Sequence, residues 1–486
     1  MSDTITFGLL LTLLAGGLLL AVVSNLLGER ARIPAPALFL VGAAVLSDLF
    51  PSLAPHSIVS VQRVVTVALV VILFDGGMHI GRGRLRTNAG AIVWLGVAGT
   101  VVTAGALTVF SHVALGFEWR TSLLLATALA PTDPAVVFSV LGRREVSGRA
   151  GVLLEGESGA NDPVGIALMV VLLGAGSTAG LGDVAQGVGE FALQMGVGGV
   201  VGVAGGLAMT WLMRRTLPAE GLYPIRVLAG AGLVFGLATL AHGSGFLAVF
   251  VAGIVLGDVR APYKREIERF HSALASLGEI VAFAALGLTV KVSGLGHGHA
   301  WEIGLLVAVV LGFAIRPVLL GALLVPLRLT RGERLFVAFS GLKGAVPVLL
   351  GTYLLSEGVP DATRLYDVVV VVVAFSVVVQ GGLVPTVARR LGVPMRVVEP
   401  EPWSLGLRFR DEPSGQRSYQ VAAGSAADGS RIEDLPFGDD AWISFVSRNG
   451  ALVQVRGETT LQSGDVVLVL VDVDDAAVID EVFVAR

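Results

Sequence analysis

Apolar segments long enough to cross a lipid bilayer dominate this sequence and restrict the folds open to it. A helix needs about 20 mostly apolar residues to span the hydrocarbon core, and by that measure the chain contains about 13 candidate spans. They lie near residues 5–27, 33–50, 58–78, 89–112, 119–141, 150–174, 185–213, 224–241, 244–258, 273–291, 301–326, 333–355 and 364–391. Hydrophobic residues make up 54% of the sequence and charged residues 15%, whereas soluble domains carry about 25% charge. We therefore expect an all-α polytopic membrane protein surrounded by the lipid bilayer.

Positive charges are unevenly shared between the connections, and this pattern orients the expected spans. Connections after odd-numbered spans are arginine-rich and include Arg82, Arg84, Arg86, Arg143, Arg144 and Arg149. The alternate connections offer Arg63, Arg120, Lys291 and Arg364. Because arginine-rich loops stay on the cytoplasmic side, the N-terminus is expected outside and everything after the last span inside. The first apolar run lacks a basic start and exceeds the core of a signal peptide, so we interpret it as a retained span.

The charge balance and the absence of cysteine exclude several classes of function. The formal net charge of −4 gives no reason to expect nucleic acid as a partner. The chain has no cysteine, which excludes disulfides, thiolate metal sites and thiol redox chemistry.

The sequence changes character after residue 391, where the last apolar segment ends. Residues 393–404 are rich in proline and charge and are expected to form a linker. Beyond them, WISFVSR, ALVQVRG and DVVLVLVD are typical of strands, and VDDAAVIDEVF is typical of a closing helix. We therefore expect a membrane domain over residues 1–392 and a small cytoplasmic α+β domain over residues 405–486.

Two expected spans contain helix-breaking residues near their centres. The span at 119–141 contains ALAPTDPAVVF, with Thr132 and Asp133 between two prolines. The span at 333–355 contains FSGLKGAVPVLLG, with Lys343 among glycines and a proline. Proline removes a backbone donor and clashes with the preceding turn, so both spans are predicted to unwind. Paired broken helices are typical of transporters built from inverted repeats, with the site where the breaks cross at the membrane midplane.

The span at 150–174 carries the stretch GESGANDP, which places ionisable residues inside an apolar segment. Ionisable side chains at membrane depth are costly, so they indicate a function by default. Asp162, Ser158 and Thr132 offer carboxylate, hydroxyl and backbone carbonyl oxygens, the ligands that a hard monovalent cation prefers. Burial raises the proton affinity of a carboxylate, and a bound cation lowers it. We therefore expect a secondary antiporter in which a proton and a cation compete for one buried aspartate, with alternating access from the two sides.

Several motifs along the chain resemble those of a known transporter family. They are LFDGG (73–77), PTDPA (131–135), GESGANDP (156–163), GLYP (221–224), GSGFLAVFVAGIVLG (243–257), IRP (315–317) and GLKGAVP (341–347). The set resembles the cation:proton antiporter-1 family, and within it the NhaP-type bacterial potassium/proton antiporters that end in a TrkA-C (RCK-C) domain. The tail is similar to that domain in its RNG turn and its TTLQSGD before an apolar strand.

The resemblance implies roles for the residues around GESGANDP. The Asn161-Asp162 pair matches the family's Asn-Asp motif, in which the aspartate binds the proton or the cation in turn. Thr132, Asp133 and Ser158 match residues that help to hold the ion.

The resemblance also implies a structural charge pair. Glu157 matches an acid that pairs with a basic residue of the span at 333–355. Relatives usually have arginine in that motif, whereas this chain has Lys343, which keeps the charge and loses the bidentate fork. Arg316 is therefore the alternative partner.

Location and partners follow from the same resemblance. It implies a bacterial inner membrane, a homodimer and a small regulatory ligand such as a nucleotide on the C-terminal domain. It favours K⁺ as the transported cation, with Na⁺ left open, and it implies no cofactor beyond these ions and H⁺. The protein is expected to be a transporter and not an enzyme.

Alternative interpretations apply to single residues and to the whole chain. Asp133 is also suited to cap a half-helix after the break, and Asp162 to make a structural hydrogen bond. Asp75 of LFDGG either lies on the ion pathway or caps a helix end. An ion channel gated by an RCK-type domain is the alternative function, although the chain lacks a TVGYG-like filter loop. A membrane aspartyl hydrolase using Asp133 and Asp162 would leave Lys343 and the tail without a purpose.

Overall fold

The computed structural model describes residues 35–55, 57–141, 144–174, 181–215, 221–259, 263–397, 416–436, 441–449, 451–471 and 476–483, with residues 8, 12, 15–17 and 19. Most of the expected first span, 5–27, and the second half of the expected linker lie outside these residues. The chain divides into two compact units, and the boundary between them in the sequence falls between Pro402 and Trp403.

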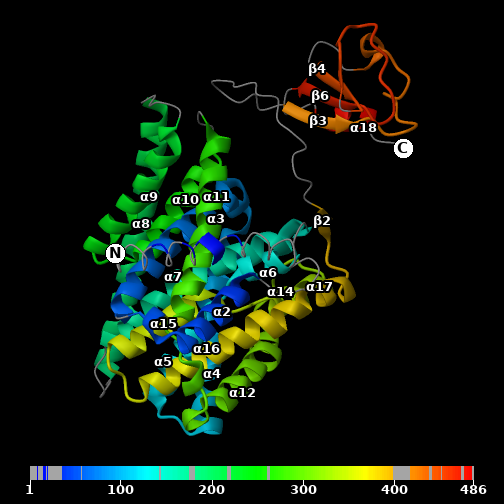
Figure 1. Ribbon diagram of the computed structural model, residues 1–486. Coiled ribbons are helices and arrows are strands. Elements are labelled where there is room, and N and C mark those ends of the chain that lie inside the picture. Colours follow the sequence, from blue (N-terminus) through cyan, green and yellow to red (C-terminus); the bar gives the residue numbers. More distant parts are fainter. Residues whose placement is uncertain are drawn as a thin grey trace. The chain divides into compact units, whose positions relative to one another are not determined.

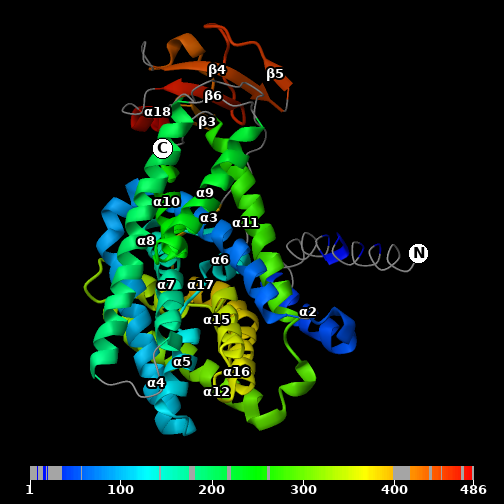
Figure 2. The ribbon, with the colours of Figure 1, turned by 90° about the vertical axis from the view of Figure 1, so that its left-hand side faces the viewer.

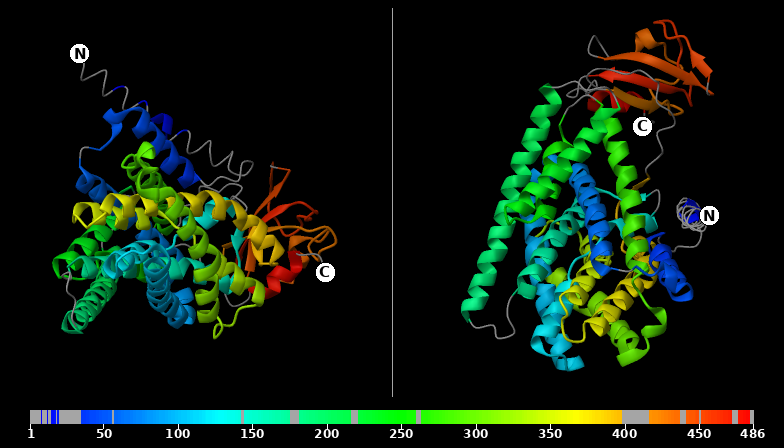
Figure 3. Two further views of the ribbon diagram at one scale, coloured as in Figure 1. Left: turned by 90° about the horizontal axis from the view of Figure 1, so that it is seen from below. Right: turned by 60° about the vertical axis from the view of Figure 1, so that its left-hand side comes forward.

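The first unit is a bundle of helices (Figure 1), seen from two further directions in Figure 3. The helices are α2 (Ala35–Leu49), α3 (Ile58–Val93), α4 (Thr100–Leu115), α5 (Trp119–Leu129), α6 (Pro134–Leu141), α7 (Gly148–Gly174), α8 (Leu181–Arg215), α9 (Leu222–Leu240), α10 (Gly245–Gly257), α11 (Lys264–Gly287), α12 (Ala300–Val310), α13 (Arg316–Leu323), α14 (Arg331–Phe339), α15 (Ala345–Ser356), α16 (Ala362–Phe375) and α17 (Gly381–Arg390). Wider π turns connect α3 to α4, α12 to α13 and α16 to α17, at Trp94–Gly99, Leu311–Ile315 and Ser376–Gln380.

The apolar segments expected from 33–50 onward each coincide with a helix or a short series of helices. Among the described residues, 6 helices are long and apolar enough to cross a membrane, or up to 7 if the bent pair α5–α6 counts as one span. Other expected spans correspond to shorter apolar helices, such as Gly245–Gly257 and Ala345–Ser356. The all-α membrane fold is therefore confirmed, and the number of spans stays a prediction.

Two spans are broken where the proline and glycine pattern predicts. Helices α5 and α6 bend by 40° at residues 130–133. Helices α14 and α15 are separated by residues 340–344, which are not helical. The two breaks touch, because the backbone N–H of Asp133 donates to the carbonyl oxygen of Leu342 at 2.8 Å. Four half-helix ends therefore meet at one crossing.

Close backbone contact holds α3 against α10 (Figure 2). A Cβ at Gly77 would collide with the carbonyl oxygen of Phe250, and one at Gly253 would collide with that of Phe74. Helix α3 bends at Gly81, whose φ of 62° and ψ of 172° suit glycine. These glycines fix the direction in which α3 leaves the bundle.

A short antiparallel pair of strands lies at one end of the helical unit. Strand β1 (Arg144–Val146) pairs with β2 (Met395–Val397). Part of the region expected to be a linker thus forms a strand against the segment that precedes α7.

The second unit is a small α+β domain built on one antiparallel sheet. The sheet has the order β3-β6-β4-β5, formed by β3 (Gln416–Gln420), β6 (Val466–Val471), β4 (Ala441–Arg448) and β5 (Ala451–Val453), and it is followed by α18 (Ala476–Phe483). The three expected strands and the closing helix are confirmed, while β3 was not predicted because QRSYQ is mostly polar.

An ion pair fixes the turn before β6. The guanidinium of Arg448 donates from Nε and Nη2 to the two carboxylate oxygens of Asp465, at 2.9 and 2.8 Å. Burial alone would raise the pKa of Asp465, but hydrogen bonds from Arg448 and from the Gln462 N–H hold this pKa below its ordinary value. The carboxylate therefore stays charged and holds the turn.

Candidate functional site

The candidate site lies where the two breaks cross and α7 packs beside them. The N-termini of α6 and α15 and the C-termini of α5 and α14 all end at this crossing. Helix N-termini carry partial positive charge and C-termini partial negative charge. Charged and polar side chains here therefore face helix ends as well as one another.

A hydrogen-bond network joins α7 to the first break. The hydroxyl of Ser158 donates to the carbonyl oxygen of Thr132 at 2.5 Å. The Asn161 amide donates from Nδ2 to Thr132 Oγ1 at 2.7 Å and accepts at Oδ1 from the Thr132 N–H at 3.3 Å. All three side chains are buried. The unwound backbone of Thr132 is thus held in place, and its oxygens are kept beside α7.

Asp162 lies next to this network on the same helix, with only 8% of its surface exposed. Among the described residues, the charges of Asp133 and Lys343 act on its carboxylate, and no hydrogen-bond donor does so. A buried carboxylate without a donor is costly unless it is protonated or binds a cation. Asp162 therefore has the surroundings of a group that exchanges ligands.

Asp133 caps the N-terminus of α6, the half-helix that follows it. Its Oδ1 accepts a hydrogen bond from the Ala135 N–H at 2.9 Å, which is the contact of an N-cap on α6. A Cβ at Gly344 would collide with the Asp133 carboxylate, so the carboxylate also lies against the N-terminus of α15. Asp133 therefore makes the N-cap contact that the alternative interpretation expected. Its carboxylate also lies close enough to Asp162 for its charge to act there.

Lys343 binds the C-terminal end of α5, a half-helix of the other broken span. Its ammonium group donates to the carbonyl oxygens of Ala130 and Pro131, both at 3.1 Å. These carbonyls follow the C-terminal end of α5, where a positive charge is favourable. With 2% of its surface exposed, Lys343 is one of the most buried basic residues at the crossing.

The partner of Glu157 is Arg316, the alternative of the two expected partners. The distance from Arg316 Nη2 to Glu157 Oε1 is 2.8 Å, and each side chain is 3% exposed. A Cβ at Gly341 would overlap the Arg316 guanidinium, so the second break leaves room for it. The expectation that Glu157 makes its ion pair with Lys343 is therefore corrected. The ammonium group of Lys343 donates to backbone carbonyl oxygens instead. The planar guanidinium of Arg316 fits the Glu157 carboxylate better than an ammonium group would.

Two polar residues that sequence reasoning did not single out complete the second break. Ser376 Oγ accepts from the Lys343 N–H at 3.0 Å and donates to Gln380 Oε1 at 3.1 Å. Gln380 Nε2 donates to the carbonyl oxygen of Phe339, at the C-terminal end of α14, at 2.7 Å. A glutamine inside an apolar segment was the signal in the sequence for this contact.

Glu279 on α11 is a third residue that sequence reasoning missed. Its Oε1 is buried, and among the described residues it has no hydrogen-bond partner. The charge of Asp133 acts on the Glu279 carboxylate. An acid inside the expected span at 273–291 was again the available signal.

Asp75 lies inside α3, where its side chain contacts α11, and not at a helix end. Ser272 donates to Asp75 Oδ1 at 3.0 Å, and His79 Nδ1 lies 3.4 Å from Asp75 Oδ2. Because α3 continues in both directions from Asp75, the capping interpretation is wrong. Ser272 and Glu279 are seven residues apart on α11, so they share one helix face.

The oxygen-rich crossing is suited to an alkali cation. Asp162, the Ser158 hydroxyl and the Thr132 carbonyl provide hard oxygen ligands. Among the described residues, no group of three or more His, Cys, Asp or Glu could hold a metal ion.

Comparisons with known proteins identify the family of both units. The family model described as "Sodium/hydrogen exchanger, transmembrane" matches residues 17–390, and the TrkA-C domain matches residues 417–484. The K(+)/H(+) antiporter NhaP of Alkalimonas amylolytica is 31% identical over 472 residues, covering 96% of this chain and 82% of that protein. The K(+)/H(+) antiporter NhaP2 of Shewanella sp. (strain MR-4) is 30% identical over 474 residues, covering 93% and 80%. The Na(+)/H(+) antiporter NhaH of Halobacillus aidingensis is 25% identical over 402 residues, covering 79% and 97%.

A solved structure has the same fold. The sodium proton antiporter MjNhaP1 from Methanocaldococcus jannaschii at pH 8 superposes with a TM-score of 0.62 at 22% sequence identity, covering 81% of this chain and all of that chain. The channel alternative is set aside by the match over the helical unit. The chain belongs to the sodium/hydrogen exchanger family of cation/proton antiporters and carries a TrkA-C domain at its carboxyl end.

Proposed function

We propose that this protein exchanges K⁺ for protons across a bacterial inner membrane by competition of the two ions for the Asp162 carboxylate. Three observations on Asp162 carry the proposal. The side chain is buried, and it lacks a donor among the described residues. Ser158, four residues earlier on the same helix face, is hydrogen-bonded to the Thr132 carbonyl oxygen. The K⁺ assignment is supported by the relatives named as K(+)/H(+) antiporters. Na⁺ is the second cation to test, because another relative is named a Na(+)/H(+) antiporter.

The exchange cycle follows from electrostatics at one buried group. A proton neutralises Asp162 and removes the reason to bind a cation, whereas a bound cation stabilises the carboxylate and displaces the proton. Thr132 and Ser158 supply further ligand oxygens, and Asn161 holds Thr132 in position. Because each ion must leave before the other binds, alternating exposure of the site converts competition into coupled exchange.

The charged groups around Asp162 are assigned supporting roles. Asp133 and Lys343 set the field at the carboxylate and hold the helix ends in place. The Glu157–Arg316 pair joins α7 to α13. We assign Asp75 of α3 and Glu279 of α11 to the ion pathway, because both are acids inside apolar segments and Asp75 contacts α11 through Ser272.

The orientation and partners belong to the same proposal. The arginine pattern favours an external N-terminus and a cytoplasmic TrkA-C domain. We also propose that the protein is a homodimer, and that the TrkA-C domain binds a small ligand, such as a nucleotide, that sets the exchange rate.

The test compares wild-type protein with Asp162→Asn in everted membrane vesicles loaded with a pH-sensitive dye. Addition of K⁺ should release the proton gradient in wild-type vesicles and leave it unchanged with Asp162→Asn, because the amide keeps the shape and does not ionise. Glu302→Gln, at an exposed position, is the matched control and should behave as wild type. Exchange by Asp162→Asn at the wild-type rate would overturn the proposal.

A further inference from the structure

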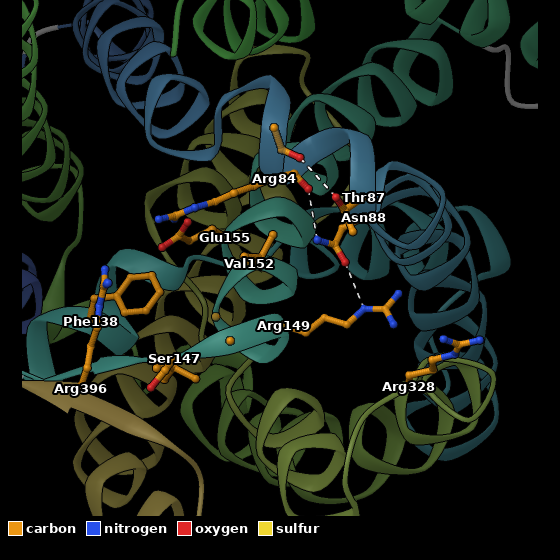
Figure 4. Close-up of a pocket in the computed structure, with 14 residues that line it drawn as sticks. Arg84, Thr87, Asn88, Phe138, Ser147, Arg149, Val152, Glu155, Arg328 and Arg396 are labelled. Carbon is orange, nitrogen blue, oxygen red and sulfur yellow. Dashed lines mark hydrogen bonds between the residues drawn. The ribbon is translucent and has the colours of Figure 1, made fainter. Parts of the chain in front are cut away.

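A cavity of about 750 Å³ lies at the N-terminal end of α7, the helix that carries Asp162 further along (Figure 4). Segments far apart in the sequence form its walls: α3 beyond its bend, Phe138 of α6, the end of β1, the first turns of α7, Arg328 and the strand β2. This volume is within the range of small-molecule sites and exceeds what one phosphate group needs.

The cavity is strongly positive. Arg84, Arg149, Arg328 and Arg396 line it, against one acid among the lining residues, Glu155. Figure 4 shows Arg149 and Arg328 approaching one another on one side, with Arg84, Glu155 and Arg396 on the other. Low-dielectric walls around like charges concentrate a positive potential, which attracts anions and repels the cations that the protein transports.

Arg149 is held in place for this role. Its Nε donates to Asn88 Oδ1 at 3.0 Å, and Asn88 Nδ2 donates to the carbonyl oxygen of Arg84 at 3.1 Å. Asn88 is buried, so the anchor of the guanidinium is rigid. The two terminal nitrogens of an arginine held through Nε remain suited to bind two oxygens of one anion.

The first turn of α7 adds a second kind of donor. Gly148, Arg149 and Gly151 belong to this turn and line the cavity. The first backbone N–H groups of a helix lack partners within it, and the helix dipole favours an anion beside them. Backbone and side-chain donors thus converge on the same space.

Topology alone does not account for this cluster. The positive-inside rule places arginines near helix ends, as for Arg86, whose exposed side chain does not line the cavity. That rule requires neither a hollow nor an arginine anchored by a buried asparagine. It also does not gather arginines from α3, α7, the segment after α13 and β2 around one space.

We propose that this cavity binds a phosphate-bearing anion, held by Arg149, Arg328 and the first turn of α7. The bound anion would tie β2, which precedes the TrkA-C domain in the chain, to the helix that carries Asp162. Two sources share this chemistry: a water-soluble phosphate compound and the phosphate of an anionic lipid headgroup.

The test measures binding to the purified full-length protein and does not depend on transport. In one arm, inorganic pyrophosphate is titrated calorimetrically into protein in phosphatidylcholine nanodiscs at physiological ionic strength. In the other arm, native mass spectrometry counts the phosphatidylglycerol molecules retained after extraction from mixed bilayers. The variants are Arg328→Gln and Arg149→Gln, with Arg86→Gln as the matched control.

Saturable binding in either arm, weakened about tenfold by Arg328→Gln and unchanged by Arg86→Gln, is the expected result. Binding of pyrophosphate alone identifies a soluble ligand, and retention of phosphatidylglycerol alone identifies a lipid. Arg328→Gln is the variant that tests the site, because the Arg328 side chain is exposed and its change should leave the fold intact. Arg149→Gln also removes the hydrogen bond to Asn88. Absence of saturable binding in both arms, or equal weakening by Arg86→Gln, would overturn the proposal.

Discussion

Residues 130–133 and residues 340–344 are two unwound stretches between half-helices, and they differ in the charge that each supplies to the crossing. The first stretch supplies Asp133, which caps the half-helix that follows it. The second supplies Lys343, which reaches across to the carbonyl end of the other broken span. The C-terminal end of α14 is capped by Gln380, a neutral residue from a different helix.

This difference distinguishes residues that support the crossing, Asp133 and Lys343, from the residue that exchanges ions, Asp162. Asp133 and Lys343 both neutralise helix ends, so both have contacts that a transported ion would have to displace. Asp162 comes from the unbroken helix α7 and has no such contact among the described residues. A carboxylate on a continuous helix beside two broken ones can thus change its ligand without unfolding the crossing.

Removing the charge of the second break should have the largest effect. Lys343→Met leaves the carbonyls of Ala130 and Pro131 unpaired and removes the positive charge that acts on Asp162. Removing one partner of a buried charge arrangement costs about 3–5 kcal/mol. We expect this cost to fall on the crossing itself and to lower exchange by at least about a hundredfold. The measurement is K⁺-dependent proton release in proteoliposomes, normalised to inserted protein.

Lys343→Arg is the matched variant for this prediction. The guanidinium keeps the charge and should retain part of the activity. If Lys343→Met proves as active as Lys343→Arg, the ammonium does not support the crossing.

Breaking the Glu157–Arg316 pair should have the next largest effect. We expect it to lower the stability of the fold more than it changes the exchange mechanism. Arg316→Met leaves the 3% exposed Glu157 carboxylate unpaired, so the unfolding free energy should fall by about 3 kcal/mol. Glu157→Gln in the same chain removes the orphaned charge and should restore most of the loss. Thermal unfolding of the two single variants and the double variant checks this, and additive damage in the double variant would show that the residues are not coupled.

Changing the first break should have the smallest effect of the three. In Asp133→Asn the side-chain oxygen still accepts from the Ala135 N–H, since asparagine is as good an N-cap as aspartate. The lost charge alters the field at Asp162, so exchange should fall by about tenfold with the fold intact. Asp133→Ala, which removes cap and charge together, should be clearly worse in thermal stability. Equal stability of the two variants would remove the capping role.

Much of the crossing could be predicted from the sequence, because proline, glycine and buried acid leave strong signals in apolar segments. PTDP and GLKGAVP located both breaks, and GESGANDP located the aspartate between them. The partner of Glu157 could not be settled, since two basic residues lay in neighbouring spans and their reach depends on helix rotation. Glu279 and Gln380 were missed for the same reason, because a single polar residue in an apolar run does not say which neighbour it faces. Strand β2 was missed because its partner β1 lies about 250 residues earlier in the chain, and long-range pairing leaves no local pattern.

The central claim is that a proton and K⁺ exclude each other at Asp162, and the most direct test is the dependence of the apparent KM for K⁺ on pH. In proteoliposomes of purified protein, the apparent KM should rise as the pH falls, because linkage between two competing ligands is reciprocal. The rate at saturating K⁺ should change little over the same range. A KM for K⁺ that stays constant while the pH changes would contradict competition at a single carboxylate.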